Sequence, residues 1–291
     1  MIKLQGSIPA LVTPLRGGAL DLEALQRLIA FQLEGGTHGL VACGTTGESP
    51  TLSDAEHARV IAAAVEAAGR TIVIAGCGAA STEHAIKLAK QAKAAGAGAS
   101  LVVTPYYNRP SQAGLFAHFK AIAEAVDLPM LLYNVPARTS VDLLPETVAK
   151  LSRVANIVGV KDASRDLGRV AQHANECADG FILISGEDDT AVGFNAMGGQ
   201  GCISVTANVA PRLCADLQNA CLAGDYARAR AINLTLAALH KAMFVEPSPA
   251  APKYALSLLD ICDAEVRAPL LPLSEAAQPV VRAAMSQAGL L

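Results

Sequence analysis

Lys161 is the residue whose position most directly indicates chemistry. It ends the apolar run 157–161, and Asp162 follows it. Lysine is rarely found at the end of a buried strand unless it is paired or functional. Burial favours the neutral amine over the ammonium, and a neutral amine can attack a carbonyl carbon. Two interpretations are open at this point: a Schiff-base lysine, or a structural ion pair with Asp162 or another carboxylate.

Tyr133 ends another apolar run, residues 130–133. A tyrosine ring can pack in a core while its hydroxyl faces a site as a hydrogen-bond donor or acceptor. Beside a Schiff-base lysine, such a hydroxyl could transfer protons. The alternative is a core tyrosine with a single hydrogen bond.

Two further segments could bind an anion. The turn Gly44-Thr45-Thr46-Gly47 has two glycines and two hydroxyls, so its N–H groups and side chains could hold a carboxylate or a phosphate. Arg138 follows a turn stiffened by Pro136 and could bind a carboxylate through two hydrogen bonds. A plain turn and a surface arginine would give the same patterns.

The elements that must position these residues recur along the chain. Continuous apolar runs, each followed by a turn, cover residues 8–13, 39–44, 71–76, 100–104, 130–133, 157–161, 181–185 and 201–205. Helical patterns lie between and after them, at 22–33, 54–67, 82–94, 112–125, 145–151, 166–177, 189–197 and 211–222. Runs without polar alternation are typical of parallel strands covered on both faces. Eight such units predict a (β/α)8 TIM barrel, with an open doubly wound sheet as the alternative.

The strand signals stop after residue 224, which predicts a catalytic barrel over 1–224 and a C-terminal helical domain over 225–291. Helical patterns there cover 226–243, 255–260 and 276–288, and the proline-rich stretch 246–252 is expected to separate the first two. In such a barrel the active site lies at the carboxyl ends of the strands. The strand ends deliver hydroxyls, one lysine and one arginine but no histidine, which disfavours histidine-based catalysis.

Composition excludes several functions. The chain has 291 residues, 52% of them apolar, and a formal net charge of −3, so we expect no nucleic-acid partner. We see no signal peptide and no apolar stretch of the ~20 residues that a membrane helix needs. Seven cysteines without a C-x-x-C pair fit free thiols in a cytoplasmic protein. The spacing predicts no metal site, and the segment Gly76-Cys77-Gly78 lacks the remaining features of a dinucleotide-binding motif, so we expect no cofactor.

Taken together, the motifs resemble the dihydrodipicolinate synthase and N-acetylneuraminate lyase family of class I pyruvate aldolases. The resemblance runs from about Gly6 to the C-terminus. It is carried by Gly44-Thr45-Thr46-Gly47-Glu48, Tyr133-Asn134-Val135-Pro136 with Arg138-Thr139, and Gly159-Val160-Lys161. Thr104-Pro105-Tyr106-Tyr107-Asn108 and Arg138 favour members that condense pyruvate with L-aspartate 4-semialdehyde to 4-hydroxy-tetrahydrodipicolinate, in diaminopimelate and lysine biosynthesis.

The resemblance implies roles for particular residues. Lys161 would form an imine with pyruvate, and Thr45 and Thr46 would hold the pyruvate carboxylate. Thr45, Tyr133 and Tyr107 would form a proton relay, with Tyr107 donated by a neighbouring subunit of a homotetramer built as a dimer of dimers. Arg138 would bind the carboxylate of aspartate semialdehyde. Gly186 and Ile203 would line the pocket that holds Lys161.

The resemblance also bears on regulation. Lysine-sensitive members of the family bind free L-lysine in a cleft between two subunits, away from the imine. This sequence keeps Ser49, His57 and Tyr106 there, but Ala80 and His84 replace an asparagine and a glutamate. We therefore expect weak or absent inhibition by lysine, because an ammonium leaving water needs acceptors.

Two other functions remain as alternatives. One is a sister aldolase acting on a sugar acid such as N-acetylneuraminate or 2-keto-3-deoxygluconate, against which Arg138 argues. The other is a catalytically silent barrel that binds a keto acid. The combination of Lys161, Tyr133, Thr45 and Tyr107 argues against that second alternative.

Overall fold

A computed structural model describes residues 2–291 and contains one sheet of eight parallel strands. The strands follow the order β1-β10-β9-β8-β7-β6-β5-β4. Their bounds are β1 (Gly6–Pro9), β4 (Gly39–Ala42), β5 (Ile72–Gly76), β6 (Ala99–Val103), β7 (Met130–Asn134), β8 (Ile157–Asp162), β9 (Ile182–Ser185) and β10 (Gly201–Ser204). Each of the eight predicted runs therefore overlaps a strand, although β1 begins two residues before its run, and every strand pair within the sheet is parallel.

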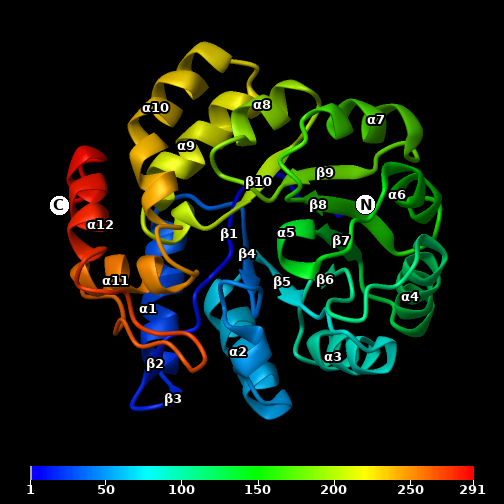
Figure 1. The fold of residues 1–291 in the computed structure, drawn as a ribbon, viewed down its shortest axis with the longest axis horizontal. Coiled ribbons are helices and arrows are strands. Elements are labelled where there is room, and N and C mark those ends of the chain that lie inside the picture. Colours follow the sequence, from blue (N-terminus) through cyan, green and yellow to red (C-terminus); the bar gives the residue numbers. More distant parts are fainter. Residues whose placement is uncertain (1) are drawn as a thin grey trace.

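The sheet closes on itself between its first and last strands. Ala10, directly after β1, forms a parallel bridge with Val41 of β4, and the Leu11 N–H donates to the Val41 carbonyl at 2.9 Å. Figure 1 shows the strands gathered at the centre with helices around them. The predicted TIM barrel is confirmed, and the open doubly wound sheet was the wrong alternative.

The helices that follow the strands also match the sequence patterns. Around the barrel lie α1 (Leu22–Glu34), α2 (Asp54–Ala68), α3 (Thr82–Ala94), α4 (Gln112–Ala125), α6 (Pro145–Leu151), α7 (Gly168–Glu176), α8 (Ala191–Ala196) and α9 (Pro211–Leu222). Ser53 and Glu56 form a capping box at the start of α2, and the Ser81 hydroxyl accepts from the His84 N–H at the start of α3. Local capping therefore sets where these two helices begin.

Apolar side chains form two cores because each strand is covered on both faces. One cluster fills the barrel interior and includes Ile8, Val41, Leu131, Ile184 and Ile203. The larger cluster lies between the strands and the surrounding helices. This packing accounts for the continuous apolar runs, since neither face of a strand meets water.

Three features were missed or misplaced by sequence reasoning. The hairpin β2 (Leu15–Arg16) and β3 (Ala19–Leu20) turns through Gly17 and Gly18, both at positive φ, and the short helix α5 (Pro136–Thr139) follows β7. The prediction that residues 246–252 only separate two helices was wrong, because α11 (Ala250–Leu258) begins inside that stretch. Pro252 lies in its first turn, where the missing N–H needs no partner within the helix.

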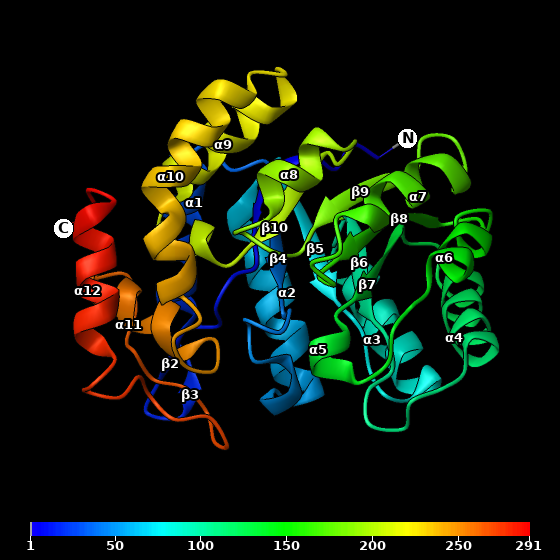
Figure 2. The same ribbon diagram turned by 45° about the horizontal axis from the view of Figure 1, so that its top comes forward.

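The chain after α9 packs beside the barrel. It contains α10 (Tyr226–Ala242), α11 and α12 (Gln278–Gln287), which lie together at one side of the molecule near α1 and α9 (Figure 2). The division into a barrel and a separate C-terminal domain remains a prediction. Among residues 2–291, no helix is both long enough and apolar enough to span a membrane.

Candidate active site

Strand register brings Lys161 and Tyr133 side by side. The two residues are Cα partners in the β7–β8 ladder, near the carboxyl ends of both strands. The Lys161 Nζ lies 4.0 Å from the centroid of the Tyr133 ring. The Lys161 side chain thus meets the face of an aromatic ring, an apolar surface that also attracts a cation.

Lys161 has no ion pair among the described residues, although it is buried at 6% exposure. Asp162, the partner considered above, contacts other groups: its Oδ1 accepts from the Ser164 N–H at 2.7 Å, and its Oδ2 lies 3.6 Å from His173 Nε2. Burial alone would raise the pKa of Asp162, but His173 and Ser164 outweigh it and hold that pKa below its ordinary value. The geometry therefore does not support a structural Lys161–Asp162 pair.

Gly186 leaves room for the Lys161 side chain. A Cβ placed on Gly186 would lie 3.0 Å from Lys161 Cε and 2.7 Å from the Ala163 Cβ. The Gly186 N–H also donates to the Asp162 carbonyl at 2.7 Å, so the backbone cannot easily move away. Glycine is the side chain that fits beside an extended lysine at this position.

A cavity of about 400 Å³ opens at the carboxyl ends of the strands. Most of the predicted site residues line it, as do several residues that sequence reasoning had not assigned to the site, among them Arg165, Glu187 and Phe244. The full lining is Ala10, Val41, Gly44, Thr45, Thr46, Leu101, Tyr133, Val135, Ala137, Arg138, Lys161, Arg165, Gly186, Glu187, Val205 and Phe244. Glu187 could have been suspected because it follows a strand end, whereas nothing in the local pattern around Phe244 places it at the barrel mouth.

The turn that carries Thr45 and Thr46 is fixed by a buried ion pair. Glu48 ends the turn with φ of 56°, and its Oε1 accepts from the Lys253 ammonium of α11 at 2.5 Å. Its Oε2 accepts from the Arg267 N–H at 2.8 Å, and both charged side chains are almost fully buried. Burial lowers the pKa of Lys253, while Glu48 opposes that shift. The C-terminal segment therefore holds the candidate carboxylate-binding turn.

Two predicted site residues lie outside this cavity. Tyr107 is 94% exposed and has φ of 70°, so its hydroxyl does not meet Thr45 or Tyr133 within one chain. Ile203 is buried in the core inside the barrel, in the same cluster as Tyr133 and Ala163, and is not part of the cavity lining. One chain therefore gathers Thr45, Thr46, Tyr133, Arg138, Lys161 and Gly186 but not Tyr107 or Ile203.

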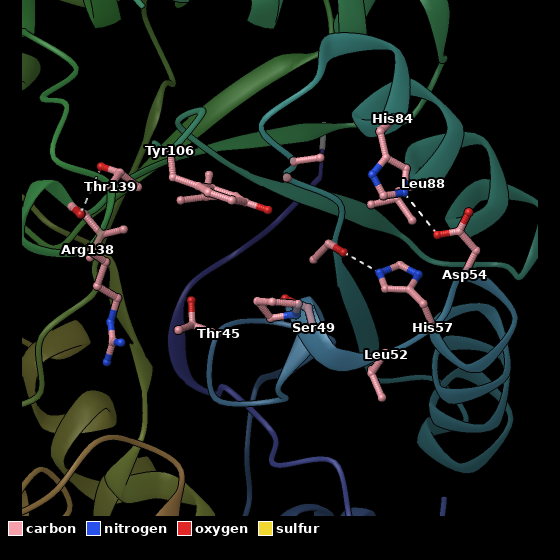
Figure 3. Close-up of a pocket in the computed structure, with 16 residues that line it drawn as sticks. Thr45, Ser49, Leu52, Asp54, His57, His84, Leu88, Tyr106, Arg138 and Thr139 are labelled. Carbon is pink, nitrogen blue, oxygen red and sulfur yellow. Dashed lines mark hydrogen bonds and ion pairs between the residues drawn. The ribbon is translucent and has the colours of Figure 1, made fainter. Parts of the chain in front are cut away.

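A second cavity, of about 340 Å³, adjoins the first and shares Thr45, Val135 and Arg138 with it. In Figure 3 the Tyr106 ring lies between Arg138 and Thr139 on one side and the group His57, His84 and Asp54 on the other. The His57 ring and the Gly76 carbonyl are 2.7 Å apart, and His84 Nε2 lies 3.0 Å from Asp54 Oδ1. Within residues 2–291, no group of three or more His, Cys, Asp or Glu side chains could hold a metal ion.

The fold and the site together indicate a class of enzyme. A closed parallel barrel with a tyrosine and a buried lysine at its carboxyl end, the lysine without an ion-pair partner in the described part of the chain, is the arrangement expected of a lysine-imine enzyme of the (β/α)8 class. The comparison with known proteins is more specific. The chain belongs to the Dihydrodipicolinate synthetase family, whose sequence profile matches residues 3–288.

Proteins similar to this chain match it over nearly their full length. A 4-hydroxy-tetrahydrodipicolinate synthase from Ruegeria pomeroyi is 55% identical over 288 residues, which cover 99% of each chain. The corresponding protein from Hyphomonas neptunium is 56% identical, with 98% of each chain covered. The crystal structure of the dihydrodipicolinate synthase from Acinetobacter baumannii, complexed with pyruvate, matches with a TM-score of 0.97 and 44% identity over 99% of this chain and 100% of that one.

Proposed function

We propose that this chain is an aldolase-type carbon–carbon lyase that condenses pyruvate with L-aspartate 4-semialdehyde to give 4-hydroxy-tetrahydrodipicolinate, in the diaminopimelate route to lysine. The observation that carries the proposal is the buried Lys161, which has no carboxylate partner within residues 2–291 and lies over Tyr133 at the mouth of the barrel. Relatives with the name of this activity are 53% to 56% identical over almost the whole chain.

The reaction would begin at Lys161. Its amine attacks the keto carbon of pyruvate, and loss of water gives a protonated imine. The imine withdraws electrons, so the pyruvate methyl group loses a proton and becomes an enamine carbon. That carbon attacks the aldehyde of aspartate semialdehyde. The amino group of the adduct then displaces Lys161 from the imine, which closes the ring and frees the lysine.

The chain supplies binding groups for two carboxylates. The turn with Thr45 and Thr46 lines the same cavity as Lys161, so its hydroxyls and N–H groups can hold the pyruvate carboxylate. Arg138 lines the cavity as well and can bind the carboxylate of aspartate semialdehyde through two hydrogen bonds. These positions keep the two reacting carbons close together, which is a large part of catalysis in such sites.

Proton transfer would pass through Tyr133 and Thr45 and be completed by Tyr107 of a second subunit. The 94% exposure of Tyr107 supports this assignment, because a side chain that is free on its own chain can enter a neighbour. We therefore propose a homotetramer built from two tight dimers. We also propose a cytoplasmic location, since seven free cysteines are typical of a reducing compartment.

A coupled assay of the purified protein with pyruvate and aspartate semialdehyde tests the function. Arg138→Ala is expected to lower kcat/KM for aspartate semialdehyde by roughly 30- to 1,000-fold, because a charge-assisted contact of about 2–4 kcal/mol is lost. The same variant should still form the pyruvate imine. Turnover of a sugar acid with no activity toward aspartate semialdehyde would favour the sister aldolase instead.

A further inference from the structure

An arginine and a glutamate that the mechanism does not use meet at the rim of the active-site cavity. Arg165 follows β8 and Glu187 follows β9, so neighbouring strands bring them together. The Arg165 Nε and one terminal nitrogen lie 2.9 and 2.8 Å from Glu187 Oε2. The same terminal nitrogen lies 3.4 Å from Asp189 Oδ2. Both Arg165 and Glu187 line the cavity that contains Lys161.

The two partners differ in burial. The Glu187 side chain is only 19% exposed, whereas that of Arg165 is 60% exposed. Burial raises the pKa of Glu187, and Arg165 and Lys161 oppose that shift. The Ser185 hydroxyl donates to the Glu187 carbonyl at 2.9 Å and accepts from its N–H, which fixes the backbone there. A mostly buried carboxylate is thus held at the cavity wall and depends on one arginine for its partner.

Arg165 occupies an unfavourable backbone conformation. Its φ is 66°, in the left-handed region that side chains with a Cβ rarely adopt. An arginine at such a position indicates that its side chain contributes something that glycine would not. What the guanidinium reaches from there is Glu187 and Asp189.

The charges that line the cavity indicate what the Arg165 side chain contributes. Among the residues that line the cavity, the basic side chains are those of Arg138, Lys161 and Arg165, and the acidic one is Glu187. Both substrates of the proposed reaction carry a carboxylate, and a free glutamate at the rim would repel them.

We propose that Arg165 is a specificity-determining residue, whose guanidinium neutralises Glu187 so that the cavity accepts substrates that carry carboxylates. The inference rests on the proposed function, because it is the carboxylates of those substrates that Glu187 would repel. Arg165 would act through its charge on Glu187 at the rim of the cavity, without direct contact with a substrate.

The test measures the pyruvate concentration that gives half-maximal borohydride trapping at Lys161 in the full-length protein. Arg165→Ala should raise that concentration roughly five- to tenfold at low salt, and added NaCl should shrink the effect by screening. Glu187→Gln should lower it, and the double variant should return to within about twofold of the unsubstituted protein. Arg165→Lys should lie near the unsubstituted protein, because the positive charge is kept.

Two controls separate charge from folding. Arg165→Gly removes the same charge while relieving the backbone, so it should behave like Arg165→Ala. Methyl pyruvate lacks the carboxylate, and its half-saturating concentration should not respond to Arg165→Ala. The inference is overturned if Arg165→Ala leaves the half-maximal trapping concentration of pyruvate unchanged. It is also overturned if adding Glu187→Gln to Arg165→Ala does not bring that concentration back toward the value of the unsubstituted protein. If the unsubstituted protein traps no pyruvate at all, the proposed function fails as well, which distinguishes the two outcomes.

Discussion

At the scale of single residues, the site depends on a lysine whose neighbours are an aromatic ring and a glycine. The centroid of the Tyr133 ring lies 4.0 Å from Lys161 Nζ, and Gly186 leaves space for the lysine methylenes. The carboxylate next in sequence, Asp162, is directed to Ser164 and His173. Among residues 2–291, Lys161 therefore has no ion-pair partner, which is compatible with a nucleophilic lysine.

Tyr133→Phe tests the role of the hydroxyl at this scale. The ring would still pack over Lys161, so the melting temperature should change little. If the hydroxyl transfers protons, kcat should fall by about 10²–10⁴-fold. Steady-state kinetics and thermal unfolding of the variant measure both effects.

Tyr254→Phe is the matched control for that substitution. It also removes a buried tyrosine hydroxyl, one that lies 2.7 Å from Arg282 Nε and outside the cavity. It should therefore leave kcat almost unchanged. Activity of Tyr133→Phe close to that of the control would show that Tyr133 is a packing residue only.

Residue types and strand ends were enough to predict most of the site. Lys161, Tyr133 and Arg138 could be placed from the sequence because each lies at or just beyond the end of an apolar run. Arg165 and Glu187 could not be paired in advance, because their contact depends on strand register and on the left-handed backbone of Arg165. The placement of Tyr107 in a neighbouring subunit remains a prediction.

At the scale of elements, the anion-binding turn is held by a segment distant in sequence. The Glu48 carboxylate accepts hydrogen bonds from the Lys253 ammonium of α11 and from the Arg267 N–H. The Arg267 guanidinium also donates to the Thr51 carbonyl at 2.9 Å. The Thr13 hydroxyl donates to the Gly47 carbonyl at 2.7 Å. The conformation of the turn therefore depends in part on residues that follow the barrel in sequence, Lys253 and Arg267.

Lys253→Met tests that dependence. Removing one partner leaves the Glu48 carboxylate buried and unpaired, which should cost about 3–5 kcal/mol of stability. Denaturant unfolding measures the loss, and the KM for pyruvate should rise because Thr45 and Thr46 lose their support. Glu48→Gln combined with Lys253→Met should be less destabilised than Lys253→Met alone. Equal losses in the single and double variants would contradict a role for the ion pair.

Element boundaries were predictable where capping signals were local. Ser53 with Glu56 and Ser81 mark helix starts that the structure confirms. The start of α11 was misplaced because prolines in its first turn look the same in sequence as prolines that end a helix. The hairpin β2–β3 was missed because each strand has only two residues, which is too short for any periodic pattern.

At the scale of the whole molecule, eight strand-then-helix units were enough to predict the barrel. The contact that closes the barrel could not be predicted, because the bridge joins Ala10 and Val41 from different units. The contribution of Phe244 to the cavity was also hidden, since it comes from the segment after α10. Local patterns predict elements well, but contacts between distant segments require the folded chain.

The second cavity contains most of the residues that the family resemblance assigns to a lysine-binding cleft. Ser49, His57, Tyr106 and His84 line it. Here His84 contributes to the cavity and is already paired with Asp54, and Ala80 is not part of its lining. We predict weak or absent inhibition by L-lysine, with half-maximal inhibition above about 1 mM, where binding contributes only ~4 kcal/mol. A coupled assay with lysine raised into the millimolar range measures it, and inhibition well below that concentration would contradict the prediction.

Covalent trapping with pyruvate and borohydride, followed by peptide mass analysis, tests whether Lys161 forms the imine. We expect a reduced three-carbon unit on Lys161, its loss in Lys161→Ala and its retention in Lys120→Ala, whose side chain is about half exposed and pairs with Glu124 outside the cavity. Stable addition at another lysine, or no addition at all with a folded protein, would contradict the assignment of Lys161 as the Schiff-base residue.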